Sequence, residues 1–151
     1  MALTVGQAAP KFVSKDQNGQ PISLDQFLGQ KVALYFYPKD STPGCTEQAC
    51  NLRDSMPVLQ AAGYQVIGVS VDDEKSHQKF ITKYDLNFPL VADTDHALVE
   101  AYGVWVEKSM YGKKYLGIAR TTFLIDEAGN LSRIIEKAKT KDHAQQILEG
   151  K

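Results

Sequence analysis

One stretch constrains the fold more than any other, residues 31–51, which read KVALYFYPKDSTPGCTEQACN. It opens with an apolar run over residues 32–37, typical of a strand buried on both faces. A proline and then a Pro-Gly pair interrupt the run, and a helix carrying Cys45 and Cys50 is expected to follow. This strand–turn–helix arrangement places the first helical turn, with its free N–H groups and positive dipole end, at an exposed edge. A cysteine in that turn is favoured as a thiolate, which is the nucleophilic form.

The composition narrows the class of protein. The chain has 151 residues and a formal net charge of -1, so no charge excess points to nucleic acid or to a membrane surface as a partner. No apolar run approaches the roughly 18 residues of a membrane-spanning helix, and the N-terminus MALTVGQAAPKF does not resemble a signal peptide. We therefore expect one domain over residues 1–151 in the cytoplasm. In that reducing compartment two cysteines are more often redox-active than permanently bonded.

Local patterns predict alternating strands and helices. Asn18–Gly19 predicts an N-terminal β-hairpin, and the helix after Cys50 should reach Gly63, with Pro57 either kinking it or starting a second helix. Further strands are expected at 64–71, 90–92, 121–125 and 131–135, and further helices at 72–84, 96–102 and 141–148. Residues 104–117 read as a polar and aromatic connection with its tip at 112–113. The order predicts an α/β fold, a central mixed β-sheet flanked by helices.

Two blocks of the sequence resemble a known family. Pro38, Thr42 and Cys45 complete the peroxiredoxin motif of proline, three residues, threonine or serine, two residues and cysteine. The distant block GVWVEKSMYGKKYLGIARTTFLID contains the counterpart of that family's active-site arginine, here Arg120. The chain thus resembles the peroxiredoxins, more narrowly the bacterioferritin comigratory protein or peroxiredoxin Q group, over nearly its whole length. The resemblance implies a thioredoxin-like fold and thiol-dependent reduction of hydrogen peroxide and organic hydroperoxides.

The resemblance also implies site residues. Cys45 would supply the attacking thiolate, and Arg120 would stabilise that thiolate and the charge developing on the leaving oxygen. The Thr42 hydroxyl would accept from the peroxide and donate to the sulfur, the N–H of Gly44 would be a further donor, and the Pro38 ring would shield the thiolate. Sulfur does all the redox chemistry in this scheme, so no metal, flavin or haem cofactor is expected.

A second role falls to Cys50. Attack on the Cys45 sulfenic acid would give a disulfide within one chain. Five residues along an intact helix separate two Cα atoms by roughly 8–9 Å, whereas a disulfide needs about 4.4–6.8 Å. We therefore expect the helix to unwind locally in each cycle. The disulfide would then be exposed to an outside reductant, and the family resemblance implies thioredoxin, with glutaredoxin as the alternative. A monomer is expected because both cysteines lie in one chain.

Other interpretations stay open at this stage. The two cysteines could be ordinary core residues, or belong to a general thiol–disulfide oxidoreductase, although that chemistry usually shows Cys-x-x-Cys. A non-enzymatic redox-sensing module or holdase is a third function. A metal site is disfavoured by the cysteine spacing. Gln48 stands where related sequences often carry Glu, so its part in orienting Arg120 is open. His77, His96 and His143 are expected on helix surfaces.

Overall fold

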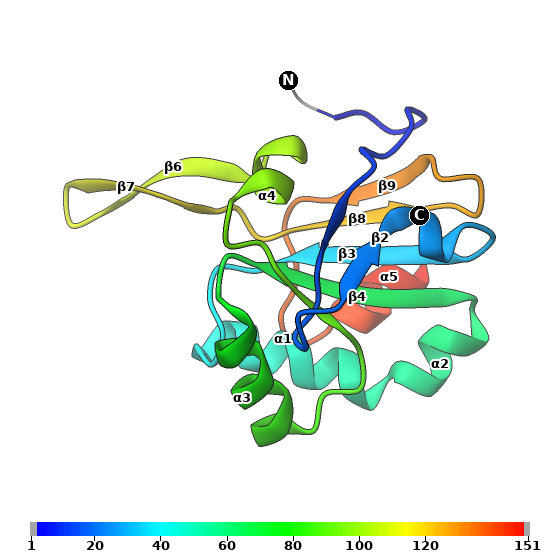
Figure 1. Cartoon of the computed structure of the whole chain (residues 1–151), viewed down its shortest axis with the longest axis horizontal. Helices are drawn as coiled ribbons and strands as arrows, with labels where there is room; N and C mark the ends of the chain where they lie inside the picture. The colour runs from blue at the N-terminus through cyan, green and yellow to red at the C-terminus, as the bar shows by residue number, and fades with distance from the viewer. Residues whose placement is uncertain (1–2, 150–151) are drawn as a thin grey trace.

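The computed structural model describes residues 3–149, in which strands and helices alternate over residues 31–101 and four consecutive strands follow over residues 105–135 (Figure 1). The strands are β1 (Val13–Lys15), β2 (Pro21–Ser23), β3 (Lys31–Phe36), β4 (Tyr64–Ser70), β5 (Leu90–Ala92), β6 (Trp105–Met110), β7 (Lys113–Ile118), β8 (Thr121–Ile125) and β9 (Leu131–Ile135). The helices are α1 (Pro43–Asp54), α2 (Met56–Ala61), α3 (Glu74–Tyr84), α4 (Ala97–Ala101) and α5 (His143–Glu149), with a short 3-10 helix η1 (Leu24–Phe27). No helix within this part of the chain is long and apolar enough to cross a membrane.

The central sheet is mixed, as the sequence predicts. Its strand order is β5-β4-β3-β8-β9, with β3 parallel to β4 and antiparallel to β8. The expected N-terminal hairpin is also confirmed, since β1 and β2 pair antiparallel across the Asn18–Gly19 turn. The sheet therefore sets β3 at its centre, so that the loop leaving β3 is held by strands on both sides.

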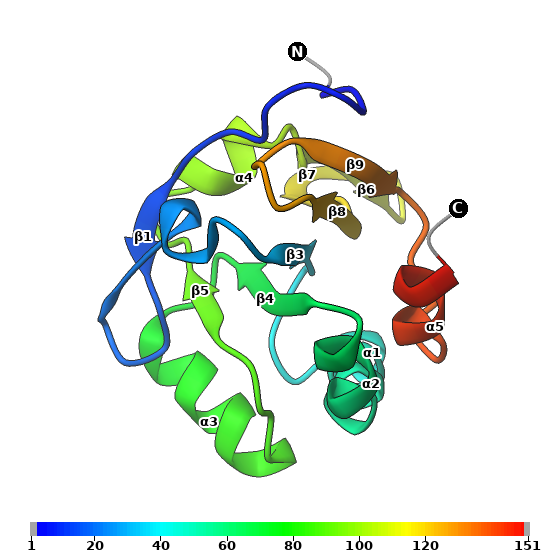
Figure 2. The same ribbon diagram turned by 90° about the vertical axis from the view of Figure 1, so that its right-hand side faces the viewer.

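Both faces of β3 are buried because its side chains alternate between two apolar cores. Val32, Leu34 and Phe36 belong to the core under α4, η1 and the N-terminal hairpin. Ala33 and Tyr35 belong to the other core, with side chains of α1, α2, α3 and α5. Figure 2 shows α1, α2 and α3 on one side of the sheet and α4 on the other. This period-two alternation explains why an unbroken apolar run forms a strand.

Helix boundaries follow capping and proline chemistry. The Asp73 side chain accepts from the Ser76 N–H at the start of α3, and the Asp93 carboxylate accepts from the N–H groups of Leu98 and Val99 in α4. Pro57 begins a second helix rather than kinking the first, because α1 ends at Asp54 and α2 starts at Met56.

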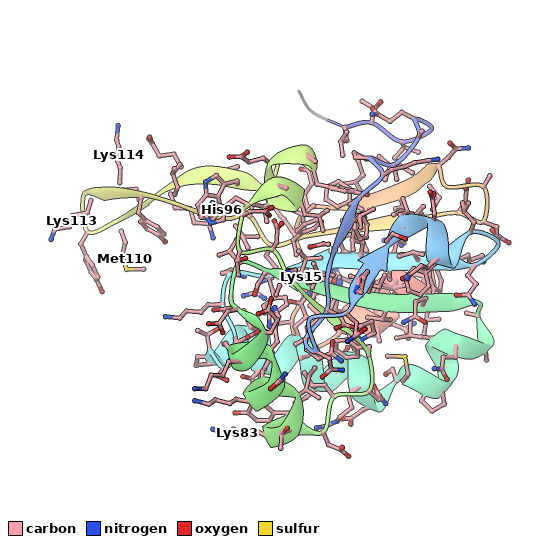
Figure 3. All side chains as sticks on the ribbon, viewed as in Figure 1. Lys15, Lys83, His96, Met110, Lys113 and Lys114 are labelled. Carbon is pink, nitrogen blue, oxygen red and sulfur yellow. The ribbon has the colours of Figure 1, made fainter. Side chains whose placement is uncertain are left out.

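The stretch expected as a polar and aromatic connection is a regular β-hairpin. β6 and β7 pair from Trp105–Ile118 to Met110–Lys113 and form a two-stranded arm. Tyr111 and Gly112 turn the chain with positive φ angles of 53° and 78°, which suits a two-residue hairpin turn. The arm projects from the body, with Met110, Lys113 and Lys114 near its tip (Figure 3). Arg120 lies at the base of this arm, in the short link between β7 and β8.

Candidate functional site

The candidate site begins where β3 ends. The chain leaves the sheet at Phe36, crosses a short loop and enters α1, for which Thr42 is the N-cap residue and Pro43 the first helical residue. Cys45 consequently lies in the first turn of α1, as the sequence predicts. Cys45 is buried, with only 1% of the residue exposed to solvent, and it is a free thiol. Exclusion of water at this position strengthens any electrostatic interaction with the sulfur.

Arg120 reaches this thiol from the other end of the sequence. Its Nη2 lies 3.4 Å from Cys45 Sγ, and its Nη1 donates to Gln48 Oε1 at 2.7 Å. β8 pairs with β3 antiparallel, so the residue just before β8 meets the end of β3. The antiparallel register thereby brings together two residues that are 75 positions apart.

Two neighbours in α1 make this approach feasible. A Cβ atom on Gly44 would lie 3.3 Å from Arg120 Nη2, so the missing side chain leaves room for the guanidinium. Gln48 is fully buried and fixes the other arm of the guanidinium fork, while its own Nε2 has no hydrogen-bond partner among the described residues. The sequence left open whether Gln48 orients Arg120. In the structure it does, because Gln48 accepts a hydrogen bond from the guanidinium.

Thr42 and Pro38 occupy the loop between β3 and α1. The Thr42 hydroxyl donates to the Lys39 carbonyl oxygen at 2.8 Å. Its single proton is therefore not directed at the sulfur, which differs from the donation to sulfur that the family resemblance implies. The lone pairs of that hydroxyl remain able to accept. Pro38 is half-buried beside the loop, whereas Pro43 is exposed.

The charges around the thiol affect neighbouring groups. Burial, followed by the charge of Cys45, raises the pKa of Tyr35 well above its ordinary value. Within residues 3–149 the Tyr35 hydroxyl has no hydrogen-bond partner. Burial and then the positive charge of Arg120 lower the pKa of Lys108, while Cys45 opposes that shift. Lys108 comes from the β6–β7 arm and is a second cation near the site, which sequence reasoning missed because nothing in its local pattern points to Cys45.

Cys50 lies farther along the same helix. It is half-buried and free, and α1 is continuous from Pro43 to Asp54, so both cysteines occupy wound helix. The next residue, Asn51, is tied to the C-terminal segment: its Nδ2 donates to the Lys141 carbonyl oxygen and its Oδ1 accepts from the Ala144 N–H. The part of α1 that carries Cys50 is thus attached to the start of α5.

The expectation that all three histidines lie on helix surfaces is wrong for two of them. His77 and His143 are fully buried, because each points from an amphipathic helix into the core and finds polar partners there. His96 is half-buried against Trp105, with ring centroids 4.4 Å apart. Within residues 3–149 no group of three His, Cys, Asp or Glu side chains is placed to hold a metal ion.

Comparison with known proteins shows the family to which the chain belongs. The AhpC/TSA family model matches residues 5–134. The chain is 47% identical to peroxiredoxin Bcp of Escherichia coli over 97% of its length and 94% of the relative's, and 44% identical to peroxiredoxin Bcp of Bacillus subtilis over 99% and 95%. A solved structure of the bacterioferritin comigratory protein of Xanthomonas campestris, studied for its alkyl peroxide reduction activity, superposes with a TM-score of 0.87 at 38% identity over 97% of this chain and 96% of that one.

These matches confirm the thioredoxin-like α/β fold and the family resemblance seen in the sequence. They also favour an enzyme over a non-enzymatic module, since the relatives are named peroxiredoxins, which are thiol-dependent peroxidases. The chain belongs to the AhpC/TSA family and, within it, to the peroxiredoxins of the Bcp and peroxiredoxin Q group, which are thiol-dependent peroxidases.

Proposed function

We propose that Cys45 is the peroxidatic nucleophile of this thiol peroxidase and that Arg120, Thr42 and Gly44 form the peroxide site around it. The observation that supports this most directly is the 3.4 Å contact between Arg120 Nη2 and Cys45 Sγ. A guanidinium carries its charge throughout the accessible pH range, so it stabilises both the thiolate and an oxyanion beside it. A cysteine that served only as a core residue would not need a guanidinium beside its sulfur, so this contact supports a catalytic role for Cys45.

The first half-reaction follows from these groups. The Cys45 thiolate attacks one oxygen of the peroxide, the S–O bond forms and the O–O bond breaks. The departing oxygen leaves as an alcohol, or as water from hydrogen peroxide, after it takes up a proton. Arg120 stabilises the negative charge that develops on this oxygen, and the Thr42 lone pairs accept from the peroxide proton. Cys45 is thereby oxidised to a sulfenic acid.

The second half-reaction employs Cys50. Its thiol attacks the Cys45 sulfenic sulfur, the S–S bond forms, the S–O bond breaks, and water leaves. Because both residues lie in continuous helix in the structure, the bridge requires α1 to unwind between them. A dithiol protein then reduces the disulfide with two electrons. Thioredoxin is the proposed reductant, with glutaredoxin as the alternative.

The remaining assignments are proposals of the same kind. Hydrogen peroxide and alkyl hydroperoxides are the proposed substrates, in line with the alkyl peroxide reduction studied in the Xanthomonas relative. A monomer is proposed because one chain contains both cysteines. The cytoplasmic location stays a prediction from the sequence.

Peroxide consumption by the pre-reduced protein tests the roles of the two cysteines. We expect wild type to consume peroxide and to form the Cys45–Cys50 disulfide, detected as a loss of two hydrogens by mass spectrometry. We expect Cys45→Ser to be inactive and Cys50→Ser to consume one equivalent and stop as a sulfenic acid that dimedone traps. Consumption by Cys45→Ser would overturn the assignment of the nucleophile.

A general thiol–disulfide oxidoreductase is separated by the same assay. It would exchange disulfides rapidly yet react with peroxide no faster than a free thiol. The Arg120→Met variant sharpens the comparison, because loss of the guanidinium should slow peroxide reduction by roughly a hundredfold or more and leave disulfide exchange nearly unchanged.

A further inference from the structure

A buried polar network lies beneath the loop that carries Thr42. Asp40 belongs to this loop and is 7% exposed, and its carboxylate accepts from the Tyr37 hydroxyl, from Ser76 Oγ at 2.8 Å and from His77 Nδ1 at 2.7 Å. His77 comes from α3 and is fully buried. The network therefore connects the end of β3, the loop and α3.

The hydrogen-bond partners define the charge state of this pair. His77 Nδ1 faces a carboxylate oxygen of Asp40, and His77 Nε2 faces the Val91 carbonyl oxygen at 2.9 Å. The Val91 carbonyl oxygen can only accept, so Nε2 donates. With Nδ1 donating to an ionised Asp40 carboxylate, the ring is an imidazolium. An ionised Asp40 carboxylate is acceptor-only and has lone pairs for all three contacts, which is the charge state that the arrangement favours. Asp40 and His77 consequently form an ion pair almost wholly shielded from water, which charge-assisted hydrogen bonds make rigid.

One peptide group connects this ion pair to the peroxide site. The carbonyl oxygen of the Lys39–Asp40 peptide accepts from the Thr42 hydroxyl at 2.8 Å. The N–H of the same peptide donates to Asp72 Oδ2 at 2.9 Å. The peptide plane is thus fixed at both ends, and the Asp40 side chain fixes the Cα atom next to it. The Thr42 hydroxyl directs its proton at this carbonyl oxygen. The orientation of the Lys39–Asp40 peptide plane therefore determines where the Thr42 lone pairs point.

The residue between Asp40 and Thr42 is strained. Ser41 has a φ of 61°, in the left-handed region that a side chain with a Cβ disfavours. Such a conformation persists only where the surrounding structure enforces it. The anchored Asp40 on one side and the start of α1 on the other supply that enforcement.

We propose that the Asp40–His77 ion pair is a positioning device for the peroxidatic loop, which holds the Lys39–Asp40 peptide so that the Thr42 hydroxyl presents only its acceptor lone pairs to the peroxide. The inference rests on the proposed functions of Cys45 and Thr42. Neither Asp40 nor His77 touches the reacting sulfur in any hydrogen bond of the described residues. Their contribution is therefore to the geometry of peroxide binding and not to the nucleophile itself.

The test compares two reactions of the Cys45 thiol. Reaction with hydrogen peroxide needs Thr42, whereas alkylation by iodoacetamide does not. Asp40→Asn keeps the size of the side chain and removes its charge. We expect it to lower the second-order rate constant with peroxide by roughly tenfold or more and to change alkylation little. In the Thr42→Val background, Asp40→Asn should add almost no further loss, because the two residues act through one hydroxyl.

A matched control and a spectroscopic measurement complete the design. Asp93→Asn alters another buried carboxylate, one that caps α4 on the far core, and it should lower stability without changing the peroxide rate. Long-range 1H–15N NMR spectra of the wild type at pH 7.5 should show both His77 ring nitrogens protonated, and Asp40→Asn should leave one nitrogen unprotonated. This measurement stands even where the variant folds poorly.

Three results would overturn the proposal. They are a neutral His77 ring in the wild type, equal losses of peroxide reaction and alkylation in Asp40→Asn, and multiplicative losses in the Asp40→Asn/Thr42→Val double variant. Failure of the proposed function itself looks different, because Cys45→Ser would then retain peroxidase activity whatever the Asp40 variants do.

Discussion

Cys45 and Cys50 lie in one continuous helix, five residues apart, and both are free thiols. Residues so spaced have Cα atoms roughly 8–9 Å apart in a regular helix, which exceeds the reach of a disulfide. In the proposed mechanism this reduced form is the one that reacts with peroxide, and a Cys45–Cys50 disulfide form would differ from it in α1.

Oxidation should therefore expose the backbone of α1. We expect amide hydrogen exchange over residues 45–51 to become at least tenfold faster when one equivalent of peroxide converts the reduced protein to the disulfide. Exchange in α3, which carries no cysteine, serves as the internal reference and should change little. Equal protection of α1 in both redox states would contradict the unwinding.

Asn51 should slow the resolving step, because its side chain makes two hydrogen bonds to the C-terminal segment. Each bond contributes about 0.5–1.5 kcal/mol, so Asn51→Ala should ease local unwinding and accelerate disulfide formation by about tenfold. Stopped-flow measurement separates this step from oxidation of Cys45, whose rate should not change. A resolving rate equal to that of wild type would show that the contact with α5 does not limit unwinding.

Gln48 should act on peroxide reduction through Arg120, since its Oε1 accepts from Nη1 at 2.7 Å. Gln48→Leu leaves that nitrogen without a partner, and we expect kcat/KM for peroxide to fall by about tenfold. Gln48→Glu retains an acceptor and also removes the unpartnered buried Nε2, so its kcat/KM should stay within a few-fold of wild type. If both variants lose activity equally, the packing of this residue matters and its hydrogen bond does not.

Gly44→Ala should separate activity from stability. The new Cβ would lie 3.3 Å from Arg120 Nη2 and displace the guanidinium, which lowers the peroxide rate. Alanine is favoured over glycine in helices by roughly 0.5–1 kcal/mol, so thermal unfolding should show unchanged or raised stability. A variant with full activity would indicate that the guanidinium has room to shift without losing the thiol.

His143 should make the protein sensitive to mild acid. Burial lowers the pKa of this histidine, with Arg120 and Arg133 adding to the shift and the Gln146 hydrogen bond opposing it. Below its ordinary value of about 6.5 the unfolded chain therefore binds a proton that the folded protein lacks, so stability falls as pH decreases.

The slope from this one group is at most about 1.4 kcal/mol per pH unit. Denaturant unfolding from pH 7 to pH 5 measures it, with His143→Gln as the comparison. We expect the variant to lose stability less steeply than wild type as pH falls. Parallel curves would mean that His143 is protonated equally in both states.

Local sequence determined much of this protein. The apolar run before Pro38 defined the central strand, the proline-bounded turn defined where α1 begins, and Asp73 and Asp93 defined the starts of α3 and α4. These are short-range effects of backbone geometry, capping and apolar periodicity, so a single sequence contains them. The family motif then identified Cys45, Thr42 and Arg120 as a set.

Only the tertiary structure decided how these residues meet. The contact of Arg120 with Cys45, the burial of His77 against Asp40 and the attachment of Asn51 to α5 each join residues from distant elements. Sequence patterns indicate which face of a helix is apolar, but not which polar group of a neighbouring element contacts that face in the core. For this reason the sequence did not predict the burial of His77 and His143. It also did not predict that the Thr42 hydroxyl donates to the Lys39 carbonyl oxygen instead of the sulfur.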